Sequence, residues 1–202
     1  MSTAINLIGL DPSYTRTGIC IIKDKNIYFE TASEKIGEKQ FENVVSAAQS
    51  VVKQLRSIFY KYGEEFDLIH ESPLPCSSMS PALYALDTLI YNEFESHIRH
   101  TYNPSTLKSK IHGHKYEKKD SVELTMKYIG ILQKKGYEVK SLLGTKKKIT
   151  HDNAEAFLYC HLYLHDSGHP DFQFDNTDEI QKYKLRMKEL KKREKMLMQS
   201  EE

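Results

Sequence analysis

The feature that most constrains the fold is a short apolar segment, Ile5 to Leu10, that ends at an acidic residue, Asp11. Its length and composition are typical of a buried β-strand. A polar loop follows, and Gly18 opens the next apolar segment. A carboxylate at the end of a buried strand costs several kcal/mol unless a cation, a metal ion or hydrogen bonds compensate it. Asp11 therefore either caps a turn or holds a cation.

Hydrophobic patterning predicts an α/β fold, a mixed five-stranded sheet flanked by helices. Strands are predicted over 4–11, 18–22, 27–31, 66–71 and 97–102, the first three as an antiparallel meander. Helices are predicted over 40–62, 81–95, 120–134 and 151–165. In the helix over 120–134, the residues expected to face the core are Val122, Met126, Ile129 and Leu132. A short helical turn is expected from 103, and a loop over 136–148.

Charge divides the chain into a main part and a tail. The net charge of the 202 residues is only +1, but Lys and Arg cluster at 108–119, 146–148 and 182–195. We expect one domain over 1–175 and a charged, lysine-rich C-terminal helix or tail over 176–202. Separated basic blocks are compatible with a negatively charged polymer as partner, or with solvated surface alone.

Several classes of protein are disfavoured by composition. No apolar run approaches the ~20 residues that cross a bilayer, and the first residues lack a signal-peptide pattern. Three widely spaced cysteines fit a reducing compartment. We therefore expect a cytoplasmic protein that does not enter a membrane.

Three further acids are placed where they could meet Asp11. Glu71 also ends an apolar strand, and two parallel neighbours would deliver both acids to one sheet edge. Asp152 and Glu155 share one face at the start of an apolar helix that must pack on the sheet. Each acid also has an ordinary reading as a turn, strand end or helix start. Four converging carboxylates would repel unless a divalent cation such as Mg²⁺ or Mn²⁺ sat among them. Two such ions suit in-line attack of water on a phosphodiester.

Four segments in chain order resemble motifs of the RuvC family of Holliday-junction resolvases, members of the RNase H-like superfamily. They are GLDPSYTRTG at 9–18, LIHE at 68–71, the region 102–122, and DNAEA at 152–156. The segment SPAL at 80–83 resembles the start of the family helix after the second motif. The resemblance covers roughly residues 5–165 and implies an RNase H-like fold.

The resemblance also implies a site and an activity. The metal ligands would be Asp11, Glu71, Asp152 and Glu155, holding two Mg²⁺ or Mn²⁺ ions. Lys108 and Lys119 stand at family spacings and would be cations near the scissile phosphate, with Lys118 as the choice if the register shifts by one. The residues expected to contact DNA are Arg16, Leu74, Lys110, Lys115 and Lys118. The implied activity is a crossover junction endonuclease that binds a four-way junction as a homodimer, because the junction is two-fold symmetric.

The chain departs from the family pattern in ways that leave alternatives open. Glu155 stands where aspartate is usual, and Leu74 stands where an aromatic wedge is usual. The lysine-rich tail would fit a divergent, phage-encoded member acting in the bacterial host cytoplasm. The alternatives are a nuclease for other branched DNA such as forks and flaps, a junction-binding protein with decayed catalysis, and a sugar-kinase-like phosphotransferase. The last requires two domains and a longer chain.

Three histidines also have two readings. His151, next to the last acidic pair, either assists metal binding or proton transfer or simply starts the helix. His161 and His165 have the i, i+4 spacing of metal ligands, but core or surface placement is favoured because no other ligand motif accompanies them.

Overall fold

A computed structural model describes residues 5–13, 15–33, 42–72, 81–112, 117–141 and 149–174. Its strands are β1 (Asn6–Asp11), β2 (Thr17–Lys23), β3 (Asn26–Ala32), β4 (Asp67–Glu71), β5 (Ile98–Tyr102) and β6 (Glu138–Ser141). Its α-helices are α1 (Glu42–Tyr62), α2 (Pro81–Phe94), α3 (Lys118–Lys134) and α4 (His151–Asp166). Short helical turns cover Glu95–His97 and Pro170–Phe172, and a π-helix covers Leu107–His112. The tail predicted over 176–202 lies outside the described residues.

The sheet has the order β5-β4-β1-β2-β3-β6. The predicted meander is confirmed, because β1 pairs antiparallel with β2, and β2 with β3. A tight turn joins β2 to β3, and Asp24 adopts a positive φ of 53° within it. Aspartate tolerates this left-handed conformation better than most residues. The parallel pairing of β1 with β4 is also as predicted, with Leu10 opposite His70. The next residue of each strand is therefore an acid at the same edge.

The sheet has a sixth strand, β6, in the segment 136–148 that was predicted as a loop. It pairs parallel with β3, with Val139 beside Ile27, and the Glu138 N–H donates to the Lys25 carbonyl at 2.8 Å. Only one of its four residues is apolar, so its sequence lacks the pattern of a buried strand. The open edge of β3, more than a hundred residues earlier in the chain, supplies the hydrogen bonds that make it a strand.

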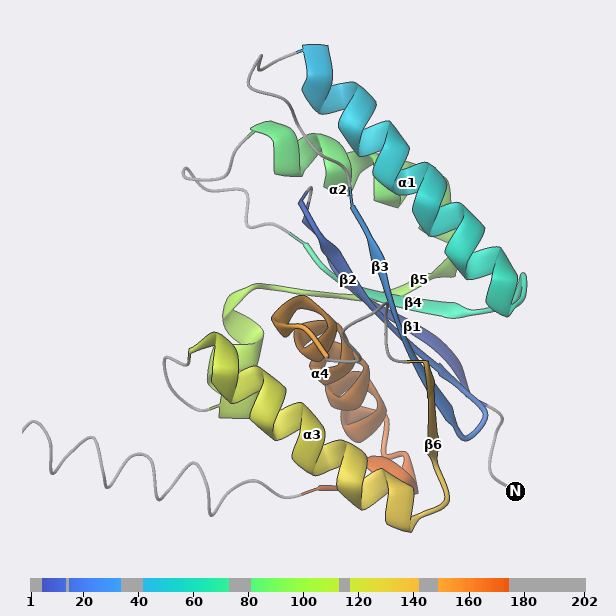
Figure 1. The fold of residues 1–202 in the computed structure, drawn as a ribbon, viewed down its shortest axis with the longest axis vertical. Helices are drawn as coiled ribbons and strands as arrows, with labels where there is room; N and C mark the ends of the chain where they lie inside the picture. Colours follow the sequence, from blue (N-terminus) through green and yellow to red (C-terminus); the bar gives the residue numbers. More distant parts are fainter. Residues whose placement is uncertain are drawn as a thin grey trace, which may run out of the picture.

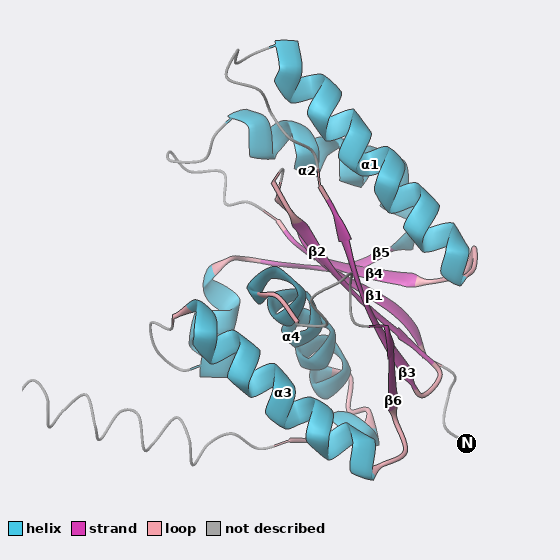
Figure 2. Cartoon of the chain, in the orientation of Figure 1, coloured by secondary structure: helices cyan, strands magenta, loops and turns pink. Residues whose placement is uncertain are grey.

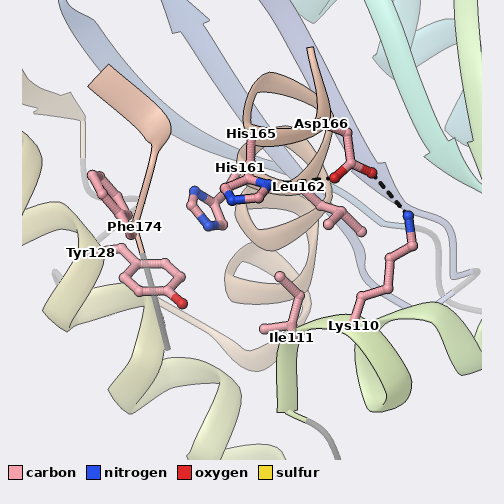
Figure 3. A pocket seen from close by; sticks show the side chains of 8 residues that line it. All are labelled: Lys110, Ile111, Tyr128, His161, Leu162, His165, Asp166 and Phe174. Atoms are coloured by element: carbon pink, nitrogen blue, oxygen red, sulfur yellow. Dashed lines mark hydrogen bonds and ion pairs between the residues drawn. The ribbon is translucent and has the colours of Figure 1, made fainter. Parts of the chain in front are cut away.

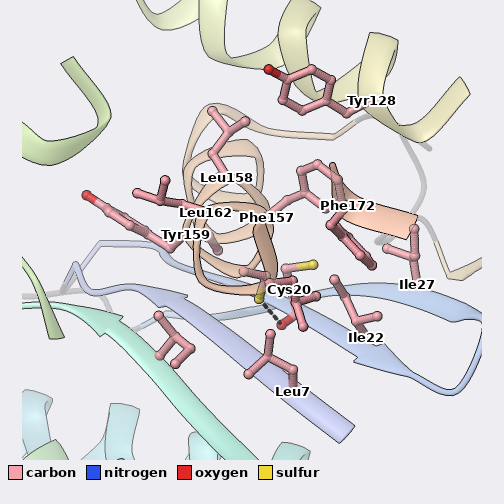
Figure 4. Close-up of a cluster of buried hydrophobic side chains, with 14 of the residues drawn as sticks. Leu7, Cys20, Ile22, Ile27, Tyr128, Phe157, Leu158, Tyr159, Leu162 and Phe172 are labelled. Atoms are coloured by element: carbon pink, nitrogen blue, oxygen red, sulfur yellow. Dashed lines mark hydrogen bonds between the residues drawn. The ribbon is translucent and has the colours of Figure 1, made fainter. Parts of the chain in front are cut away.

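Helices cover both faces of the sheet (Figure 1), with α1 and α2 on one face and α3 and α4 on the other. Figure 2 shows α4 lying directly across the strands, with α3 outside it. Each face has its own apolar cluster. Figure 4 shows the apolar side chains of α4 between the sheet, which contributes Leu7 and Ile22, and α3, where Leu158 points towards Tyr128. Residues 153–160 are all buried, the polar Asn153 and Glu155 among them, because α4 lies between the sheet and α3.

The buried face of α3 differs from the prediction. Its buried residues are Ser121, Thr125, Tyr128, Ile129 and Leu132, whereas Met126 is 54% exposed. The helix is thus rotated towards its hydroxyl side chains, because α4 offers polar partners there. One of them is the Ala154 carbonyl, which accepts from Thr125 Oγ1 at 3.2 Å. None of the described helices is both long and apolar enough to cross a membrane.

Candidate active site

Two glycines bring the acidic start of α4 against the end of the β1–β2 hairpin. Gly18 lies opposite Asp11 in the ladder. A Cβ atom at Gly18 would stand 2.2 Å from the backbone C and O of Asp152, and one at Gly9 would stand 2.3 Å from the Ala156 carbonyl oxygen. Contacts that short are possible only with no side chain. The glycines therefore set how closely the helix approaches Asp11.

Asn153 fixes the same turn of α4 from the side. Its buried amide donates to the carbonyls of Ile19 at 3.3 Å and Glu30 at 2.7 Å. Thr150, the N-cap, accepts from the Asn153 N–H at 3.2 Å and donates to its side-chain oxygen at 2.7 Å. This role of Asn153 was not predicted, although an amide between two acids at the start of an apolar helix is a signal that the sequence contains.

Three of the predicted acids lie within electrostatic reach of the fourth, Asp11. Burial raises the pKa of Asp11 well above its ordinary value. The negative charges of Glu71, Glu155 and Asp152, in that order, raise this pKa further. Lys118 acts in the opposite direction and lowers it. The Asp11 carboxyl on β1 thus lies within electrostatic range of one carboxylate on β4, two on α4 and a cation on α3.

Glu71 is held by a tyrosine that was not among the predicted site residues. The Tyr159 hydroxyl donates to Glu71 Oε2. The Tyr159 ring is fully buried and stacks on Tyr102, with 5.5 Å between ring centroids. Burial, and then the Glu71 carboxylate, raise the pKa of Tyr159, so the phenol remains a donor.

The two acids of α4 also have protein partners. Asp152 Oδ2 accepts from Nε of Arg16, an exposed side chain in the loop between β1 and β2. Glu155 Oε2 lies 3.2 Å from His151 Nε2, one turn earlier on the helix. The Ser121 hydroxyl of α3 lies 3.5 Å from Glu155 Oε1. Arg16 and His151 are therefore side chains in direct contact with the acidic cluster.

The donor set suits a hard divalent cation in chemistry and charge. All four side chains offer carboxylate oxygens, which Mg²⁺ and Mn²⁺ prefer. The pKa of Asp11 is raised by burial first and by repulsion from the other three acids second, and a divalent cation would offset both effects. Within the described residues, however, no group of three or more His, Cys, Asp or Glu side chains is arranged to hold a metal ion. Glu71, Asp152 and Glu155 contact protein partners instead.

The lysines predicted near the phosphate are placed differently. Lys118 acts on Asp11, as described above. The Lys119 ammonium instead pairs with Glu117 Oε2 at 2.9 Å, and the charges that raise its pKa are those of Glu117, Asp120 and Glu123. The backbone of Lys108 lies in the π-helix, but its side chain is outside what the structure describes. Leu74 and Lys115 also lie outside the described residues.

Lys110 lies near the other end of α4. Its ammonium pairs with Asp166 Oδ2 at 2.9 Å, at a cavity of about 240 Å³ that also contains His161 and His165 (Figure 3). Burial and His165 lower the pKa of His161 to about 3. The ring stacks on Phe174, with 5.1 Å between centroids. His161 is therefore a neutral core residue, in line with the favoured reading.

No protein-family model matches the sequence, and no curated protein matches it. The fold does match solved structures. The structure of T. thermophilus RuvC in complex with a Holliday junction substrate is similar with a TM-score of 0.53 and 15% identity, over 81% of this chain and 96% of that one. Another Thermus thermophilus RuvC structure gives a TM-score of 0.51 and 14% identity, over 81% and 97% of the two chains. At this identity the similarity establishes a RuvC-like fold.

Proposed function

We propose that this chain is a metal-dependent endonuclease that cuts four-way DNA junctions, as a divergent relative of the RuvC resolvases. The observation that carries the proposal is the convergence of Asp11, Glu71, Asp152 and Glu155 at one edge of a RuvC-like sheet. Concentrating four carboxylates is unfavourable for stability, and a shared cation gives them a function. The solved neighbour that holds a Holliday junction substrate supports junction DNA as the substrate class.

In this proposal the four acids hold Mg²⁺ or Mn²⁺, with two ions at the site. Bound there, the metal would supply an activated water and stabilise the charge of the phosphate. Lys118 is the cation best placed to face the reacting phosphate, because it already acts on Asp11. We assign this role to Lys118 in place of Lys119. Lys108 stays a candidate for a second cation.

The same geometry suggests how DNA would lie. Arg16 contacts Asp152 and is half exposed, so its guanidinium can reach a backbone phosphate beside the acids. Lys110 pairs with Asp166, which lies about 16 Å along α4 from Glu155, at ~1.5 Å per residue. It would contact DNA only away from the cleaved bond. A two-fold symmetric junction with two cuts requires two such sites, which favours a homodimer.

Cleavage of a synthetic four-way junction with Mg²⁺ or Mn²⁺ tests the proposal. Asp11→Asn and Glu71→Gln should each lower the cleavage rate at least 100-fold, roughly the loss seen when a charge-stabilising group is removed. Lys118→Ala should lower it more than about tenfold, whereas the matched Lys119→Ala should stay within about twofold. A linear duplex of the same sequence is the substrate control.

Cleavage that persists in both acid variants would refute the catalytic assignment. Tight junction binding without cleavage by the wild type would favour a junction-binding protein, and equal cleavage of forks and flaps would favour a broader branched-DNA nuclease. Equal rates for the two lysine variants would reject Lys118 as the phosphate cation.

A further inference from the structure

One side chain of the site, Tyr159, has no role in the proposed chemistry and yet contacts an acid of the cluster. It lies on α4 four residues after Glu155 and seven after Asp152. At 100° per residue, seven residues return to within about 20° of the starting direction. Asp152, Glu155 and Tyr159 therefore form one stripe along the helix face that meets the ends of β1 and β4.

The surroundings of Tyr159 leave its ring little freedom. The side chain is fully buried, and its ring stacks on Tyr102 at an interplanar angle of 18°. A buried phenol requires a hydrogen-bond partner, and Glu71 Oε2 is that partner. Tyr102 belongs to β5, the neighbour of β4, and pairs with Glu71 in the ladder. The ring is thus held by the same two strands that position the backbone of Glu71.

Glutamate, in contrast, has three side-chain torsions and many accessible rotamers. Glu71 stands at the last position of a five-residue strand and is only partly buried. The strand fixes its Cα position but not the direction of its carboxylate. A rigid donor on α4 that binds one oxygen selects the rotamers that point towards α4, where Asp152 and Glu155 also lie.

We infer that Tyr159 is a positioning residue that holds the Glu71 carboxylate ready to join Asp11 as a metal ligand. The inference rests on the proposed function, since it assigns Tyr159 a role through a predicted ligand. Hydrogen-bond donors to metal-binding carboxylates typically change metal affinity 10- to 100-fold when removed. Tyr159 would be such a donor, supplied by the same helix that carries two of the ligands.

The test is Mn²⁺ binding to the full-length protein, followed by the electron paramagnetic resonance signal of the free ion. Tyr159→Phe keeps the ring and removes only the hydroxyl, so affinity should fall about 10- to 100-fold. Tyr102→Phe is the matched control, because it removes a hydroxyl from the other ring of the same stack. The charged groups that act on the Tyr102 hydroxyl include Asp166 but none of the four acids. Its Mn²⁺ affinity should stay within about twofold of wild type.

Glu71→Gln separates failure of the inference from failure of the proposed function. If wild type and Glu71→Gln bind Mn²⁺ equally, the proposed metal site is wrong. If Glu71→Gln binds more weakly but Tyr159→Phe binds like wild type, the positioning role alone is overturned. A loss in Tyr102→Phe equal to that in Tyr159→Phe would also overturn it, because the effect would then come from packing.

A second readout covers the case in which Tyr159→Phe folds incompletely. The Mn²⁺ concentration that gives half-maximal junction cleavage depends on the metal affinity of the folded molecules. The maximal cleavage rate depends on what fraction of the molecules is folded. We expect this concentration to rise about 10- to 100-fold while KM for the junction stays unchanged. An unchanged half-saturating concentration with a reduced maximal rate would mean that Tyr159 serves stability only.

Discussion

Replacing Gly18 by alanine tests whether close packing of α4 on the hairpin builds the site. The added Cβ would stand 2.2 Å from two backbone atoms of Asp152 and 2.6 Å from the Asn153 nitrogen. These are backbone atoms, so no side-chain rotation relieves the contact. Restoring an ordinary separation of 3.4 Å requires the first turn of α4 to retreat by about 1.2 Å.

Two effects of opposite sign contribute to the change in unfolding free energy. Alanine reduces the entropy of the unfolded chain, which stabilises by about 0.4–1 kcal/mol where the native backbone suits it. Gly18 has no positive φ, so this gain applies. Overpacking costs about 1–3 kcal/mol, more when only backbone can move. The cost of the clash therefore exceeds the entropic gain. We expect the free energy of unfolding to fall by about 1–2 kcal/mol, which lowers the melting temperature by about 2–8 °C.

The larger consequence should be functional. A shift of about 1 Å in a positioned group can cost roughly 100-fold in rate. We therefore expect Gly18→Ala to lower junction cleavage about 100-fold and to weaken Mn²⁺ binding, while most molecules stay folded. Thermal unfolding by circular dichroism, Mn²⁺ titration and cleavage assays measure the three quantities.

Gly130→Ala is the matched control. Gly130 lies within α3, and a Cβ there would meet nothing within 4 Å. Alanine in a helix is favoured over glycine by about 0.5–1 kcal/mol, so this variant should be slightly more stable and fully active. If Gly18→Ala behaves like this control, with a melting temperature at or above that of the wild type and with full activity, the packing argument is refuted.

Two further substitutions probe buried polar groups. Asn153→Ala leaves the carbonyls of Ile19 and Glu30 without their donor, so the free energy of unfolding should fall by about 1–3 kcal/mol in urea titrations. An unchanged urea midpoint would contradict this. His161→Phe should reduce acid sensitivity. The pKa of His161 is lowered to about 3, by burial first and by His165 second, while the unfolded imidazole titrates near its model value of 6.5. The unfolded state therefore binds an extra proton between these values, and the wild type loses stability as the pH falls below 6.5. At pH 5 this loss is about 2 kcal/mol, and the variant should lack it when urea midpoints at pH 7 and pH 5 are compared. An equal pH dependence in both proteins would count against a neutral, buried His161.

Much of the fold could be predicted because it is encoded locally. Apolar runs of five or six residues marked β1 and β2, a shorter apolar segment around Leu68 and Ile69 marked β4, and an apolar stretch after two acids marked α4. The shared edge of Asp11 and Glu71 followed from one further assumption, the parallel pairing of their strands, which the structure confirms. β6 was missed because its strand character comes from a partner edge and not from its own four residues.

The contacts among the acids were less accessible to sequence reasoning. Charge and spacing grouped the four carboxylates, but nothing local showed that Tyr159 would meet Glu71, 88 positions earlier in the chain. Tyr159 reads as one more large residue in an apolar helix. Its polar role appears only when the hydroxyl has to find a buried partner.

Lys119 was predicted from its spacing in the family resemblance, eleven residues after Lys108, whereas the proposal of Lys118 in its place depends on how α3 is rotated. Consecutive helix residues point about 100° apart, so only one of these lysines can face the site. A core face through Met126 selects Lys119, because the two are seven residues apart on one stripe. The buried face runs instead through Ser121, which lies beside Glu155, and Lys118 is one turn before Ser121. The apolar periodicity therefore predicted the wrong buried face of α3. Burying Ser121, which contacts a buried carboxylate, is more favourable here than burying Met126, which can remain exposed. In α3, therefore, the polar residues Ser121 and Thr125 belong to the buried face, and in the proposed site this rotation favours Lys118 over Lys119 as the cation nearer the acids.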